Sequence, residues 1–149
     1  MAKKEQTDNA TAETVMKALQ LEKVLPNLTA EEASEFFPKS GLYSYEKDEY
    51  IIEQGEESKD LFVVIAGTVA ITQTFGTASG QVATLEAGKL FGEIALVAQG
   101  VRVASAIAGD GAKVFCFVQE DIERAMRAKP ALTEHLRDLA LKRLNANTA

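Results

Sequence analysis

The pattern of hydrophobic and polar positions divides the 149 residues into a β-rich centre between two helical parts. The centre holds short apolar runs that are separated by turn residues. The ten glycines all lie from Gly41 to Gly111, and the three prolines lie outside that span, where they mark helix edges. We expect one domain at 11–145, made of helices at 11–38, a β-roll at 41–119 and two helices at 120–145, with a polar, mobile leader at 1–10 and a tail at 146–149.

Two helices are predicted in the N-terminal part. The first covers about residues 11–24. The second begins with the sequence TAEE, which fits a capping box. In this motif Thr29 caps the helix, and Glu32, three residues later, accepts a hydrogen bond from the backbone amide of Thr29. Phe36 and Phe37 are the apolar anchors of this helix, and the proline that follows them marks its end.

The centre of the chain predicts a double-layered sheet. In DLFVVIAGTVAIT, every second side chain points to the same face, and both faces are apolar, which is typical of a central strand. Further strands are EYIIEQG, QVATL and AKVFCFV, and the turns lie around FGTASG and EAGK. Because no βαβ rhythm is present, we predict the α+β class, with an antiparallel β-jelly-roll barrel flanked by N-terminal helices and by two C-terminal helices.

The C-terminal part predicts a helix that is broken at Pro130, where proline is tolerated as a first helical residue. One face of the second helix carries Leu132, Leu136, Leu139 and Ala140. We therefore expect a short amphipathic helix after the break.

Composition narrows the class of protein. The apolar fraction of 46% and the charged fraction of 26% are those of a globular domain, and the apolar runs are too short to cross a membrane. Residues 1–10 lack the apolar core of a signal peptide. The single cysteine, Cys116, is flanked by apolar residues and is expected to be buried, in a reducing, cytoplasmic setting. The net charge of −6 argues against nucleic acid as the main partner.

The stretch FGEIALVAQGVRVAS, residues 91–105, is almost entirely small or apolar but contains Glu93 and Arg102. A helical turn after Gly92 would expose backbone N–H groups that suit a phosphate, and the fork of Arg102 can bind two phosphate oxygens. Two readings remain open from these residues alone. Glu93 and Arg102 could simply pair with each other, or they could bind the hydroxyl and the phosphate of a sugar phosphate.

Residues 91–105 resemble the phosphate-binding cassette of cyclic nucleotide-binding domains, the family of protein kinase A regulatory subunits, cyclic-nucleotide-gated channels and the bacterial catabolite activator protein. The family pattern is Phe-Gly-Glu, an apolar residue, Ala-Leu, a variable loop, Arg, two small residues and Ser or Thr. The similarity extends over roughly residues 12–145, including EYIIEQGEESKDLFVVIAGTVAIT and QVATLEAGKLFGE. The matching cassette residues are Phe91, Gly92, Glu93, Ile94, Ala95, Leu96, Arg102, Val103, Ala104 and Ser105.

The resemblance implies a role for several of these residues. Glu93 would accept a hydrogen bond from the ribose 2′-hydroxyl, and Gly92 would let the backbone approach the sugar. The amides of Ala95 and Val103 and the side chain of Arg102 would bind the cyclic phosphate. Ser105 is expected to contact the phosphate or the base. The C-terminal helices would form a lid over the purine, for which the candidate contacts are Leu136, Arg137 and Leu139. The two leucines can equally be ordinary core residues.

The sequence departs from the family pattern beside the arginine. Val101 replaces the proline of many members, and Val103 stands where Ala, Ser or Thr is usual. A threonine at that position is associated with cGMP, and valine has no hydroxyl. We therefore expect cAMP rather than cGMP as the ligand, and no metal.

The sequence suggests four hypotheses about function. The favoured one is a cAMP sensor that is not an enzyme and relays binding to a protein partner or effector domain, with a homodimer left open. A transcription factor would need a helix-turn-helix segment for which this chain leaves no sequence. A cupin-like enzyme would need clustered histidines, but the chain has only His135, which is expected at the surface. The remaining alternative is a degenerate scaffold for protein interaction.

Overall fold

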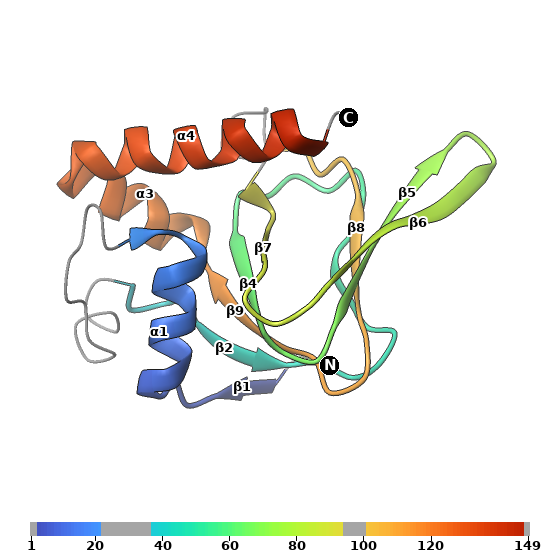
Figure 1. Cartoon of the computed structure of the whole chain (residues 1–149), viewed down its shortest axis with the longest axis horizontal. Coiled ribbons are helices and arrows are strands. Elements are labelled where there is room, and N and C mark those ends of the chain that lie inside the picture. Colours follow the sequence, from blue (N-terminus) through green and yellow to red (C-terminus); the bar gives the residue numbers. More distant parts are fainter. Residues whose placement is uncertain (1–2, 22–36, 94–100, 148–149) are drawn as a thin grey trace.

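The structure is a computed structural model that describes residues 3–21, 37–93 and 101–147. Figure 1 shows the helices gathered on one side and the β5–β6 hairpin extending away from the body of the molecule. The described elements are β1 (Lys3–Glu5), α1 (Asn9–Ala18), β2 (Gly41–Ser44), β3 (Tyr50–Ile52), β4 (Leu61–Ala66), β5 (Val69–Phe75), β6 (Ala78–Leu85), β7 (Leu90–Phe91), β8 (Ser105–Ala108), β9 (Lys113–Phe117), α3 (Gln119–Ala128) and α4 (Pro130–Asn147).

Two antiparallel sheets form the β part of the molecule. The five-stranded sheet has the order β1-β2-β9-β4-β7, and the four-stranded sheet has the order β3-β8-β5-β6. Strands that are distant in sequence are neighbours in both sheets, as in the pairings of β2 with β9 and of β3 with β8. The predicted α+β class with a jelly-roll arrangement is therefore confirmed.

The prediction of a closed barrel is wrong, because the two sheets remain separate and open. Closure needs a hydrogen-bonded ladder that continues around the whole circuit. In the described part of the chain, β7 pairs only with β4 and β3 pairs only with β8. These strands are two and three residues long, so each offers too little backbone to join the sheets.

The core lies in two layers on either side of β4. Leu61 and Val63 point toward the helices, whereas Phe62 and Val64 point between the two sheets. Val63 and Val64 are both completely buried, which confirms the predicted central strand with two apolar faces. Strand β9 alternates in the same way, and its Cys116 is buried between the sheets as expected.

The C-terminal helices follow the predicted break. Helix α3 ends at Ala128, Lys129 is extended, and Pro130 is the first residue of α4. An extended residue before proline avoids a clash with the proline ring. The four apolar residues predicted to share one face of α4, from Leu132 to Ala140, are all buried.

The N-terminal part differs from the expectation in three ways. Lys3–Glu5, inside the expected leader, forms strand β1 against β2, and the Lys113 Nζ lies 3.0 Å from the Glu5 Oε1. Backbone pairing needs no apolar side chains, so the hydropathy pattern gives no sign of this strand. Helix α1 begins at Asn9 with Asp8 as its cap and ends at Ala18, because Gln20 adopts a positive φ of 51°. The capping box at Thr29 lies outside the described residues, as does Phe36.

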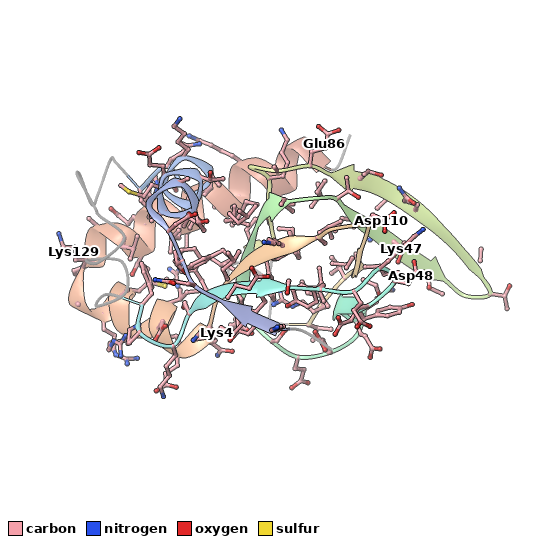
Figure 2. The ribbon with its side chains drawn as sticks, turned by 90° about the horizontal axis from the view of Figure 1, so that it is seen from below. Lys4, Lys47, Asp48, Glu86, Asp110 and Lys129 are labelled. Atoms are coloured by element: carbon pink, nitrogen blue, oxygen red, sulfur yellow. The ribbon has the colours of Figure 1, made fainter. Side chains whose placement is uncertain are left out.

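Charged side chains lie at widely separated places on the molecule. In Figure 2, Lys47, Asp48 and Asp110 lie near one another, and Lys129 lies on the opposite side, near the junction of α3 and α4. Within the described ranges, no helix combines the length and apolar character that crossing a membrane requires.

Candidate functional site

A cavity of about 490 Å³ opens between the β5–β6 hairpin and the segment around Arg102. This volume is in the range of sites for small molecules. Apolar side chains form most of its wall, and Gln73, Glu93, Arg102 and Ser105 supply polar groups. The lining residues are Ile52, Ile71, Gln73, Val82, Ala83, Leu85, Leu90, Phe91, Gly92, Glu93, Val101, Arg102, Val103, Ala104, Ser105 and Ala106.

Gly92 stands at the point where β7 ends and the chain turns into the cavity wall. Its φ is +85°, a left-handed conformation that glycine adopts most easily. A Cβ on Gly92 would lie 2.9 Å from the Asp60 carbonyl oxygen and 3.1 Å from the Arg102 Nη1. The neighbouring Phe91 is buried and stacks on Phe62, with ring centroids 5.0 Å apart. Glycine is thus required by both conformation and space.

The Arg102 side chain is buried, with only 5% of its surface exposed, and it is held by three protein oxygens. Its Nε donates to the Ser58 hydroxyl at 2.8 Å, its Nη1 to the Gly92 carbonyl at 3.0 Å and its Nη2 to the Asp60 carbonyl at 2.8 Å. The guanidinium also lies 5.9 Å from the centre of the Phe62 ring. A guanidinium has five N–H groups, so two of them form no hydrogen bond with the residues that the structure describes.

The backbone of the arginine segment is fixed by the loop after β3. The Arg102 amide donates to the Glu56 carbonyl at 2.9 Å, and the Gly55 amide donates to the Arg102 carbonyl at 2.8 Å. The Gln54 amide donates to the Ser105 hydroxyl at 2.9 Å. One loop therefore positions both the backbone and, through Ser58, the side chain of Arg102.

Burial lowers the pKa of the Arg102 guanidinium, and the negative charges of Asp60 and Glu56 oppose this change. Arginine keeps its proton in proteins because its ordinary pKa is above 12. The site thus contains a permanent positive charge in a place with little water, where its attraction for an anion is stronger than at an open surface.

Glu93 and Arg102 lie at the same cavity. Both side chains are buried and both line it. The Arg102 guanidinium donates hydrogen bonds to Ser58, Gly92 and Asp60, and the negative charge of Glu93 also acts on it. One cavity therefore contains a buried acid and a buried base.

The structure brings together the described members of the predicted site. Phe91, Gly92, Glu93, Arg102, Val103, Ala104 and Ser105 all line the cavity. Val103 is half exposed at the cavity wall, and its carbonyl accepts a hydrogen bond from Gln73. Ile94, Ala95 and Leu96 lie outside the described residues.

The predicted lid residues lie elsewhere. Leu136 and Leu139 belong to the core beneath α4, which agrees with the alternative that they are ordinary core residues, and Arg137 is exposed. None of the three lines the cavity. His135, expected at the surface, is half-buried, and its Nε2 lies 2.8 Å from the Leu19 carbonyl oxygen.

Sequence reasoning missed two groups of residues. The first is the support of Arg102 by Ser58 and Asp60, for which the polar run ESKD just before a buried strand was the available signal. The second is the wall from β5 and β6, which includes Ile71, Gln73 and Val82. Residues 71 and 73 share a face by strand alternation, but only the folded sheet shows that this face borders the cavity.

Comparison with known proteins agrees with this geometry. A family model described as "Cyclic nucleotide-binding domain" matches residues 42–129. The chain is 36% identical to cGMP-dependent protein kinase 2 of Homo sapiens over 97 residues, which are 64% of this chain and 13% of the kinase. It is 32% identical to the cyclic AMP receptor protein of Thermus thermophilus over 101 residues, which are 67% of this chain and 47% of the receptor.

A solved structure shows the same fold. The cyclic nucleotide-binding domain from Methylobacillus flagellatus has a TM-score of 0.78 with 16% identity, over 99% of this chain and 83% of that chain. The chain spans less than half the length of the two relatives, so the resemblance concerns one of their domains. The family match covers more than half of the chain and contains the described cavity residues that carry the charges. The chain therefore belongs to the cyclic nucleotide-binding domain family.

Proposed function

We propose that the cavity binds a 3′,5′-cyclic nucleotide, cAMP in preference to cGMP, and that the chain acts as a sensor rather than as an enzyme. The observation that carries the proposal is the convergence of buried Arg102, buried Glu93 and Gly92 on one cavity. A cyclic nucleotide carries one negative phosphate, one ribose hydroxyl and a largely apolar base face. These groups correspond to the positive, acidic and apolar parts of the wall.

The roles of the residues follow from their chemistry. Arg102 binds the cyclic phosphate through the two N–H groups that the protein leaves available. The Glu93 carboxylate accepts a hydrogen bond from the ribose 2′-hydroxyl. Val103 offers no hydroxyl to guanine, which supports the preference for cAMP. The predicted contact of the Ala95 amide with the phosphate, and that of Ser105 with the phosphate or the base, are part of the same proposal.

A route from the site to the helices supports the sensor role. The Asp60 carbonyl accepts from Arg102, and the Asp60 carboxylate accepts from the Gln119 amide at 2.6 Å, at the first residue of α3. An anion bound to the Arg102 guanidinium changes the strength of the hydrogen bond from Arg102 to the Asp60 carbonyl. Asp60 is the residue directly before strand β4. The start of α3 is therefore directly tied to the group that meets the ligand.

The C-terminal helices complete the proposal. Because Leu136, Arg137 and Leu139 do not line the cavity, capping of the base by α4 requires a movement of α4 relative to the β-roll. Such a movement can transmit binding to a protein partner or to an effector domain. The ligand can shift the equilibrium between the two positions of α4 only by the difference in its affinity for them.

Calorimetric titration and thermal unfolding with cAMP, cGMP and AMP test the proposal. We expect cAMP to bind more tightly than cGMP, and AMP not to bind. At 100 times Kd, cAMP should stabilise the fold by about 2.7 kcal/mol, which raises Tm by roughly 5–10 °C. If neither cyclic nucleotide binds at millimolar concentration, the chain is a scaffold and the proposal is wrong.

The role of Arg102 is tested with Arg102→Lys and Arg102→Ala, each checked for folding by circular dichroism. Loss of the buried partner for phosphate should weaken cAMP binding by a factor on the order of 30 to several thousand. Arg102→Lys keeps the charge but loses the planar fork and should be intermediate. Arg127→Ala is the control, since Arg127 is exposed on α3. Folded Arg102 variants that bind like the parent would refute the assigned role.

A further inference from the structure

One wall of the cavity carries a single polar side chain among apolar ones. Strands β5 and β6 contribute Ile71, Gln73, Val82, Ala83 and Leu85 to the lining, and only Gln73 among them can form hydrogen bonds through its side chain. Gln73 follows Ile71 by two residues, so both side chains lie on the same face of β5. An amide in an otherwise apolar wall gives orientation and selectivity to a bound ligand.

The orientation of the Gln73 amide is fixed by the protein. Its Nε2 donates to the Val103 carbonyl oxygen at 3.1 Å. A flipped amide would place its own oxygen against that carbonyl, so the flip would replace attraction by repulsion. In the described part of the chain, no donor contacts the Gln73 Oε1. The side chain therefore offers an acceptor of defined position and one remaining N–H.

The sheet leaves room beside this amide. Gly80 is the cross-strand partner of Gln73 on β6, and a Cβ placed on Gly80 would meet no atom within 4 Å. The pairing shifts between Ile71 and Thr72, which leaves Val82 as an extra residue in β6. Such a bulge re-aims side chains, and here both Val82 and Ala83 line the cavity. An apolar surface at Val82 and the amide of Gln73 thus border the same cavity.

A glutamine amide distinguishes purines by their edges. It pairs with adenine at two atoms, accepting from the 6-amino group and donating to N7. Guanine presents two acceptors, O6 and N7, at the same edge. A glutamine whose oxygen cannot turn away meets the guanine O6 with an acceptor, and the pair is lost.

We propose that Gln73, held by the Val103 carbonyl, is the residue that selects the base, and that it favours a base with an exocyclic amino group beside a ring acceptor. The inference rests on the proposed function, since it concerns the base of the nucleotide whose phosphate binds at Arg102. It adds a polar contact from β5 to the missing hydroxyl at Val103 as a source of the selectivity.

The test compares two ligands that differ only in the amino group, cAMP and the cyclic 3′,5′-phosphate of purine riboside. Kd is measured by calorimetry for the parent chain and for Gln73→Leu. In the parent, cAMP should bind at least about five-fold more tightly than the amino-free ligand, since a good pair at a base edge is worth about 1–3 kcal/mol. In Gln73→Leu, the two ligands should bind equally. Gln73→Glu loses the donor to Val103 and should also lower the ratio.

Gln81→Leu is the matched control, because Gln81 is an exposed glutamine on β6 that does not line the cavity. It should leave the ratio of the two Kd values unchanged. A ratio that stays above five in folded Gln73→Leu would overturn the inference while leaving the proposed function intact. A parent ratio near one with tight binding of both ligands would do the same. Absence of binding by both ligands would instead refute the proposed function.

Discussion

At the scale of single residues, the Arg102 side chain is held in place by the protein itself. Three N–H groups donate to protein oxygens, and the side chain lies against the Phe62 ring. A long side chain that is already immobilised loses little conformational entropy when it binds an anion. Ser58 helps to fix the Arg102 side chain because its uncharged hydroxyl accepts a hydrogen bond from the Arg102 Nε.

Gly92→Ala tests how tightly the backbone of Gly92 is packed against Asp60 and Arg102. The new Cβ would lie 2.9 Å from the Asp60 carbonyl oxygen at a φ of +85°, so it adds a clash to the conformational strain. Gly88→Ala is the control, because Gly88 has a φ of +91° but open space around the Cβ. In urea denaturation, Gly88→Ala should cost about 1–2 kcal/mol. Gly92→Ala should cost at least about 1 kcal/mol more, and equal costs would contradict the packing argument.

Cys116 links stability to alkaline pH. Burial raises the pKa of its thiol from an ordinary value of 9.0 to about 12. The unfolded chain therefore loses this proton first as the pH rises above 9, and stability falls between pH 9 and pH 12 by at most about 1.4 kcal/mol per pH unit.

Urea denaturation at several pH values measures this slope, with Cys116→Val as the comparison. The variant lacks the thiol, so its stability should fall less steeply above pH 9. Identical slopes in the two proteins would mean that Cys116 does not contribute.

At the scale of elements, the start of α3 is tied to the segment before β2 by two neighbouring acids. Asp121 is completely buried and accepts from the Lys39 amide and the Ser40 hydroxyl, both at 2.8 Å. Glu120 is exposed and forms a salt bridge with the Lys39 Nζ at 2.8 Å. The same short segment thus meets one buried and one exposed carboxylate.

These two acids should differ strongly in their effect on stability. Asp121→Asn introduces an amide donor among donors and should cost about 2–4 kcal/mol of unfolding free energy, because buried partners lose their acceptor. Glu120→Gln should cost less than about 1 kcal/mol, as exposed ion pairs do. Equilibrium denaturation of both variants gives the comparison, and similar values would show that burial of Asp121 has no energetic consequence.

At the scale of the whole molecule, the cavity and the helices share Asp60. Its carbonyl accepts from Arg102, which lines the cavity, and its carboxylate accepts from the Gln119 amide at the start of α3. If ligand binding at the cavity stabilises the start of α3, then stabilising the start of α3 must raise the affinity for the ligand, because coupling between two sites is reciprocal. The helices pack on one face of the five-stranded sheet (Figure 1), and the core layer between the two sheets lies on its other face.

Hydrogen exchange tests this coupling. Saturating cAMP should slow amide exchange in the first turn of α3 in the parent chain. Asp60→Ala removes the acceptor of the Gln119 amide but keeps the backbone carbonyl that binds Arg102, so exchange at residue 119 should be fast with and without ligand. Asp60→Asn, which retains a side-chain oxygen, is the control. A ligand response of α3 in Asp60→Ala equal to that of the parent would rule out Asp60 as the link.

The sequence by itself determined the central strand, the break between the C-terminal helices and the two charged groups that line the cavity. Alternation of apolar residues identified β4 as a central strand, and Pro130 marked the start of α4, because these signals act within a few residues of each other. The isolated Glu93 and Arg102 stood out for the same reason. A local sequence pattern is therefore sufficient to predict a feature whose physical cause lies within a few residues of it.

Only the tertiary structure decided what surrounds those groups. It showed that the sheets stay open, that β1 pairs with β2 and that Leu136 lies in the core. It also brought Ser58, Asp60 and Gln73 to the arginine segment from more than 25 residues away. The reason is that strand partners and cavity walls depend on contacts between distant segments, and a single sequence read by its local periodicity carries no record of those contacts.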